Sequence, residues 1–137
     1  MKLITPISHL FKDNDNAMKI INSSDFLEAR ERTANLRFSN TTHFHIDFDL
    51  NLGVNDKQIE FLIDYVQPRN EIEYITFQAS RDCEKIISKN GIYYPDSISI
   101  PLKDQIKNTK ESILKIQNIL GKDRNIGIEN NNYYPTG

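Results

Sequence analysis

The segment from His43 to Leu50, "HFHIDFDL", alternates polar and apolar side chains without a break. Successive side chains of an extended chain point to opposite faces, so the ionisable residues share one face and the apolar residues share the other. The ionisable set is His43, His45, Asp47 and Asp49, and the apolar set is Phe44, Ile46, Phe48 and Leu50. The pattern predicts a strand over about Thr42 to Leu50 with one buried face. Its other face is either solvated or holds a ligand such as a metal ion.

Three further segments have the composition or the period of a strand. The first is "KLITPIS" (2–8), the second is "IEYITFQAS" (72–80), and the third is "RNIGIEN" (124–130). The last two alternate, because apolar side chains occupy every second position with polar side chains or glycine between them. We therefore expect four strands.

Helical patterns separate these strands. Ser24 is a candidate N-cap for a helix from Asp25 to Ala34, and Asn55 with Gln58 forms a candidate capping box for a helix that Pro68 stops. A short helix over Asp82 to Ser88 is a further candidate, in a connection with turn signals at Asn90-Gly91. The strongest pattern covers Leu102 to Leu120, where apolar residues recur at helical spacing.

Strands and helices thus alternate along the whole chain. This order predicts an α/β fold with a parallel sheet and right-handed crossovers. A length of 137 residues suits one domain, 1–137. Helices would cover the aliphatic face of the sheet, so its polar face would look either at solvent or into the lumen of a barrel.

Composition excludes several classes of protein. A net charge of −2 offers no basic surface for nucleic acid. The single cysteine, Cys83, cannot form an internal disulfide, which favours a reducing compartment. The start, "MKLITPISHLF", has an apolar run too short for a signal peptide or a membrane span. We expect a soluble, cytoplasmic protein that binds neither nucleic acid nor membrane.

The segment "GKDRNIGIENNNYYPTG" (121–137) carries a resemblance to a known group. A helix that ends in Leu-Gly, followed by a strand closing on Ile-Glu-Asn and a loop of small residues, resembles the fourth strand of the xylose-isomerase-like superfamily of TIM barrels. That superfamily includes endonuclease IV, sugar isomerases and epimerases, and the barrels related to the methanobactin oxygenase. An eight-stranded barrel needs about 250 residues. The resemblance therefore implies the N-terminal half of a TIM-type barrel, an incomplete (β/α) domain of four strands.

The resemblance also implies a metal site. Glu129 corresponds to the strand-four glutamate that is commonly a metal ligand in these barrels, and His9 follows the segment that is similar to their first strand. His45 and Asp47 lie on the strand that looks like the second, and imidazole and carboxylate together can hold Zn, Mn or Fe. The third strand differs, because it offers Gln78 where several of these metalloenzymes supply a histidine.

Two hypotheses about function remain open. In the first, the chain is a fragment of a metal-dependent enzyme of the sugar isomerase or epimerase class, acts on a small molecule, and is inactive until completed. In the second, it is a non-catalytic α/β module that forms a homodimer to complete the sheet or binds another partner, because an open sheet edge favours pairing. The sequence does not decide between an enzyme and a binding module.

Overall fold

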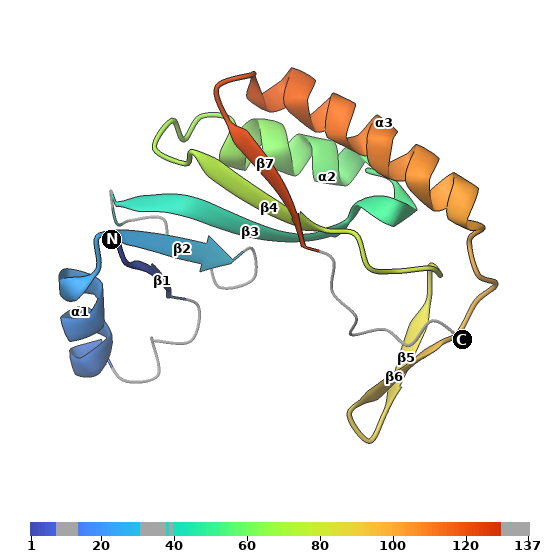
Figure 1. Ribbon diagram of the computed structural model, residues 1–137, viewed down its shortest axis with the longest axis horizontal. Coiled ribbons are helices and arrows are strands. Elements are labelled where there is room, and N and C mark those ends of the chain that lie inside the picture. Colours follow the sequence, from blue (N-terminus) through green and yellow to red (C-terminus); the bar gives the residue numbers. More distant parts are fainter. Residues whose placement is uncertain (8–13, 31–37, 39, 130–137) are drawn as a thin grey trace.

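The computed structural model describes residues 1–7, 14–30, 38 and 40–129 as a mixed α/β protein built on a five-stranded sheet (Figure 1). The strand order is β1-β2-β3-β4-β7, and every pair of neighbours is parallel. The strands are β1 (Ile4–Pro6), β2 (Phe26–Arg30), β3 (Thr41–Asp49), β4 (Tyr74–Gln78) and β7 (Asn125–Glu129). The strands therefore follow one another across the sheet in the order of the sequence.

Helices connect most of these strands. They are α1 (Asn14–Ser23), the 3-10 turn η3 (Leu50–Leu52), α2 (Asp56–Phe61) with its π-helical continuation η4 (Leu62–Val66), and α3 (Leu102–Leu120). Between β4 and α3 the chain forms an antiparallel hairpin of β5 (Ile86–Lys89) and β6 (Ile92–Pro95). Figure 1 shows α2 and α3 side by side over β3, β4 and β7, while the hairpin projects away from the sheet. No helix in the described part of the chain has the length and apolar character needed to span a bilayer.

One face of the sheet carries the core. Phe44 and Phe77 are at most 1% exposed and pack in one cluster with Leu62 of η4 and Ile116 of α3. On β2, Ala29 belongs to this cluster, whereas Leu27 packs against Ile21 of α1 in a smaller one. Because Leu27 and Ala29 point to the same side of β2, all three α-helices cover one face of the sheet.

Several expectations from the sequence are confirmed. The fold is a parallel α/β fold, and the strands expected around His45, Thr76 and Gly127 all form. The helix over Leu102–Leu120 has the predicted bounds. Asn55 and Gln58 form the expected capping box, with reciprocal hydrogen bonds of 3.0 and 2.9 Å.

The predicted helix from Asp25 to Ala34 is wrong where the structure describes it, and the sheet has five strands where we expected four. Residues Phe26–Arg30 form β2, because Leu27 and Ala29, one on each side of Glu28, point to the core face and are both fully buried there. Ser24 does not cap a helix start. Its hydroxyl donates to the carbonyl of Ile20, at the end of α1.

The short helix proposed over Asp82 to Ser88 is also wrong. Ile86–Lys89 forms β5 and pairs with β6 across a two-residue turn. Asn90 and Gly91 occupy that turn with φ values of 54° and 79°, the left-handed geometry that tight hairpins require. The turn signal thus outweighed the local helical pattern.

Candidate metal-binding site

The face of the sheet opposite the helices is polar. The parallel register places Arg30, His45, Thr76 and Gly127 in one row across β2, β3, β4 and β7. Each of the four follows a residue that packs on the helix side of the sheet, namely Ala29, Phe44, Ile75 and Ile126. Glu129 follows two residues after Gly127 on the same side, in register with Gln78. This face therefore gathers polar groups from four strands.

His45 lies at the centre of a small cluster. Its side chain is 4% exposed, and its Nε2 atom lies 3.5 Å from Asp47 Oδ1 and 3.5 Å from Glu129 Oε2. Among the described residues this buried Nε2 has no hydrogen-bond partner. His45 and Glu129 stand on β3 and β7, on either side of β4, where His45 is in register with Thr76 and Glu129 with Gln78. The cluster therefore joins two strands that are not neighbours in the sheet.

The separations within the cluster suit metal ligands better than hydrogen-bonded partners. A hydrogen bond between nitrogen and oxygen normally has a length of about 2.9 Å. Two ligands of one tetrahedral ion, with metal–ligand distances of about 2.0–2.2 Å, lie about 3.3–3.5 Å apart. In the range 40–129, with the shorter segments before it, no three His, Cys, Asp or Glu side chains are yet arranged to hold an ion.

The predicted site residues fall into two groups. The structure brings together His45, Asp47 and Glu129, which the sequence placed on two separate strands. His9 lies outside the described residues. Glu129 stands on the fifth strand of the sheet and His45 on the third, so the numbering inferred from the resemblance, fourth and second, is shifted by one. The shift arises because β2 was taken for a helix.

Asp49 belongs to the same alternating segment as His45 but has a different role. Its carboxylate is buried at the end of β3 and accepts hydrogen bonds from the backbone N–H groups of Asn51, Ser80 and Arg81, at 3.2, 3.1 and 2.9 Å. It also accepts one from the Ser80 hydroxyl at 3.0 Å. Asp49 therefore anchors the loop after β4 to the end of β3.

His43, the other histidine of the segment, is accounted for by local contacts. Its ring stacks on Tyr74 of β4 at a centroid distance of 4.5 Å and an interplanar angle of 10°. Its Nδ1 atom lies 2.8 Å from the Thr42 hydroxyl. His43 thus differs from His45, whose buried Nε2 has no hydrogen bond within the described part of the chain.

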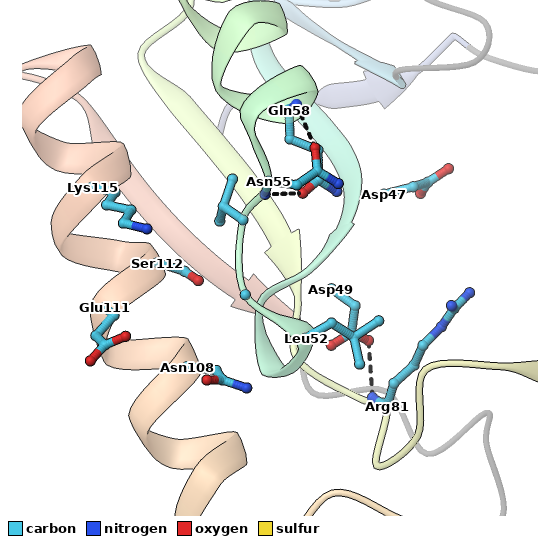
Figure 2. Close-up of a pocket in the computed structure, with 12 residues that line it drawn as sticks. Asp47, Asp49, Leu52, Asn55, Gln58, Arg81, Asn108, Glu111, Ser112 and Lys115 are labelled. Atoms are coloured by element: carbon cyan, nitrogen blue, oxygen red, sulfur yellow. Dashed lines mark hydrogen bonds between the residues drawn. The ribbon is translucent and has the colours of Figure 1, made fainter. Parts of the chain in front are cut away.

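A pocket of about 340 Å³ adjoins the cluster at the carboxyl end of β3 (Figure 2). Polar side chains of the loop after β3 and of α3 line most of it, including Asn55, Asn108 and Ser112. Figure 2 shows Asp47 on the side of this loop that faces away from α3. Asp47 therefore contributes both to the pocket wall and to the cluster around His45.

The residues that the sequence did not identify as members of this face are Arg30, Thr76 and Gly127. Arg30 was missed because the stretch Phe26–Arg30 was interpreted as part of a helix, although its alternating pattern is that of a strand. Thr76 and Gly127 carry no signal of their own. Only the register across the sheet shows that they lie between His45 and Glu129.

No protein-family model matches the chain, and no curated protein or solved structure gives a significant match. The class of this protein is therefore defined by its own geometry. It is a parallel α/β protein that carries a buried histidine between two carboxylates on the polar face of its sheet.

Proposed function

We propose that this chain forms part of the wall of a TIM-type barrel of the xylose-isomerase-like group, and that the barrel is a metal-dependent enzyme acting on a small molecule. The observation that carries the proposal is the buried Nε2 of His45, which has no hydrogen-bond partner among the described residues and lies 3.5 Å from an oxygen of Asp47 and from one of Glu129. A buried polar atom normally has a partner, and leaving one unsatisfied costs about 1–3 kcal/mol. A divalent ion would satisfy it.

The arrangement of the sheet supports the barrel. Parallel strands in sequence order, with the helices on one face, are the arrangement of a (β/α) barrel wall, whose opposite face lines the interior. Active sites of such barrels lie at the carboxyl ends of the strands. Glu129 is the last residue of β7, and Asp47 lies two residues before the end of β3. Five strands are seen, so an eight-stranded barrel needs three more from another segment or chain.

His45, Asp47 and Glu129 are the residues that would hold the ion, with His9 as a fourth donor expected from the sequence. A bound divalent ion would supply Lewis acidity to a carbonyl or hydroxyl oxygen of the substrate. The protein's own contribution is to orient the imidazole. The flanking Phe44 and Ile46 are buried under the helices, which fixes the direction of the His45 side chain from β3. The donor set suits Zn, Mn or Fe.

The proposal is tested by metal analysis. Purified protein is washed with a chelator, incubated with Zn²⁺, Mn²⁺ or Fe²⁺ and desalted, and the bound metal is counted. We expect about one ion per chain in the wild type and at least a tenfold weaker affinity in His45→Gln and Glu129→Gln, since each removes a ligand. His43→Gln is the matched control, because it changes a histidine on the same strand and face and should leave the affinity within twofold.

Two results would contradict the metal site. One is wild-type protein that retains no metal in stoichiometric amount with any of the three ions. The other is loss of binding in His43→Gln to the same extent as in His45→Gln, which would place the ion elsewhere. Thermal unfolding of each variant confirms that the fold survives the substitution.

A second candidate function is a non-catalytic module that pairs with a second copy of itself. Beside the edge strand β7 lies a mainly apolar groove of about 470 Å³, to which Leu102, Ile106 and Ile128 contribute. These three side chains are 69%, 48% and 43% exposed. Open sheet edges flanked by exposed apolar side chains favour association. This candidate is an alternative to the first, because a second copy would add five strands where an eight-stranded barrel needs three.

A further inference from the structure

Arg30 occupies a distinctive position on the polar face. It is the last residue of β2 and lies in register with His45 on the neighbouring strand β3. Its neighbour Ala29 is fully buried on the core face, so the Arg30 side chain leaves the opposite face, the one that carries the cluster. Adjacent strands lie about 4.8 Å apart. A guanidinium is therefore available one strand away from the proposed metal ligands.

The Arg30 side chain is half-buried, and no hydrogen bond or ion pair engages it among the described residues. A guanidinium has five N–H donors and stays charged at all working pH values. Two other arginines have structural contacts. Arg69 packs on the Tyr65 ring, and Arg124 donates to the carbonyls of Val66 and Gln67. Arg30 makes no comparable contact with the residues that the structure describes.

Arg30 is the positively charged side chain in the row of His45, Thr76 and Gly127. The carboxylates of Asp47 and Glu129 carry two negative charges, which one divalent ion would neutralise. Glu28, two residues before Arg30 on the same face of β2, then balances the charge of Arg30, so the case for an anion rests on the position of the guanidinium and its free donors and not on a net charge. Guanidinium groups bind carboxylate and phosphate through two parallel hydrogen bonds, which fixes the orientation of the ligand.

We infer that Arg30 binds the oxyanion group, carboxylate or phosphate, of a small substrate whose reacting oxygen lies at His45, Asp47 and Glu129. The inference rests on the proposed function for the role of the cluster. It adds the chemical class of the substrate. A neutral sugar would leave Arg30 unused, whereas a sugar acid or a sugar phosphate would engage both Arg30 and the ion.

Anion binding is measured directly by calorimetric titration with inorganic phosphate and with malonate, on Mn²⁺-loaded protein and again in excess chelator. We expect Arg30→Gln to weaken binding at least tenfold and Arg30→Lys to weaken it less, because lysine keeps the charge but loses the paired donors. Lys107→Gln removes the same charge from an exposed site on α3, where its side chain is 68% exposed, and should change binding less than twofold.

The two probes identify the oxyanion: stronger binding of phosphate indicates phosphorylated substrates, and stronger binding of malonate indicates substrates with a carboxylate. In Mn²⁺-loaded protein, phosphorus-31 relaxation should be enhanced by the nearby ion in the wild type and not in Arg30→Gln. The inference is overturned if neither anion binds the wild type at millimolar concentration, or if folded Arg30→Gln binds both as well as the wild type. If the protein takes up no metal but its anion binding still depends on Arg30, the anion-binding role of Arg30 is supported. The proposed metal-dependent activity is then excluded.

Discussion

At the scale of single residues, the alternating segment of β3 shows that similar side chains on one strand have different roles. Asp49 is satisfied by four hydrogen bonds to neighbouring loops, whereas the buried Nε2 of His45 contacts carboxylates at 3.5 Å without a hydrogen bond. A satisfied buried group contributes to stability, and an unsatisfied one costs stability unless a ligand completes it. On this strand Asp49 therefore has a structural role, whereas His45 and Asp47 are candidate ligands.

Asp49→Ala should destabilise the fold. It removes a buried acceptor that serves Asn51, Ser80 and Arg81, and the donors left behind would lie at the end of the sheet without a protein partner. We expect a loss of about 2–4 kcal/mol in the free energy of unfolding, measured by urea denaturation. Asp64→Ala, at an exposed position of η4, is the control and should cost less than about 0.5 kcal/mol. Equal effects of the two substitutions would refute the structural role of Asp49.

The sequence predicted part of the site at this scale. Alternation alone was enough to place His45 and Asp47 on one polar face, because the period of a strand is a local property. It could not show that His45, and not His43, lies between the two carboxylates, since that depends on contacts with other strands, such as the stacking of His43 on Tyr74. Arg30 was missed for a different reason, because its segment was assigned to a helix.

At the scale of secondary-structure elements, α2 shows that a correctly predicted helix can change its geometry part-way along. The capping box and the helix were predicted, and Ile63, in the part that follows Phe61, is 42% exposed. The helix continues as the π-helical turn η4, which adds residues to the turn and rotates the later side chains. Leu62 and Val66 are buried in the core cluster, and Tyr65 packs against it.

Asn55→Ala should destabilise α2 from its first turn. The substitution removes the side-chain acceptor for the Gln58 N–H, a hydrogen bond of 3.0 Å. We expect a loss of about 1 kcal/mol, the usual value for an N-cap, in chemical denaturation monitored by circular dichroism. Asn55→Asp keeps the acceptor and should retain the stability of the wild type within about 0.5 kcal/mol. A larger loss in Asn55→Asp than in Asn55→Ala would disprove the capping interpretation.

Arg124 joins two elements, because it donates to the carbonyls of Val66 and Gln67 from the turn before β7, each at 2.8 Å. Burial lowers the pKa of its guanidinium, and the charge of Glu71 opposes that shift. A cation whose pKa is lower in the folded state adds stability only as pH rises through the alkaline range, so Arg124 contributes no pH dependence near neutrality. Arg124→Met should cost about 1–3 kcal/mol equally at pH 6 and pH 8 in urea denaturation. A cost that differs between the two pH values by more than about 1 kcal/mol would contradict this account.

At the scale of the whole molecule, the parallel α/β class could be predicted from the alternation of patterns, but the number of strands could not. β2 has only five residues, and β1 only three, so their local signals are weak beside those of β3 and α3. In the described part of the chain, β1 and β7 are the edge strands of the sheet. Two copies joined edge to edge would form a ring of ten strands, whereas an eight-stranded barrel needs three strands from elsewhere.

The apolar groove beside the edge strand β7 leads to a prediction about self-association. If a second copy covers the groove beside β7, Ile106→Lys and Ile128→Lys should weaken self-association at least tenfold, because each places a charge in an apolar contact. Both side chains are already exposed, at 48% and 43%, so the free energy of unfolding of the monomer should change by less than about 1 kcal/mol. Light scattering coupled to size exclusion, over a hundredfold range of concentration, gives the association constant. Ile63→Lys is the matched control, because Ile63 is 42% exposed on η4 and lies outside the groove. A wild-type protein that remains monomeric at the highest concentration would exclude a second copy as the occupant and would leave another segment or a different protein to complete the sheet.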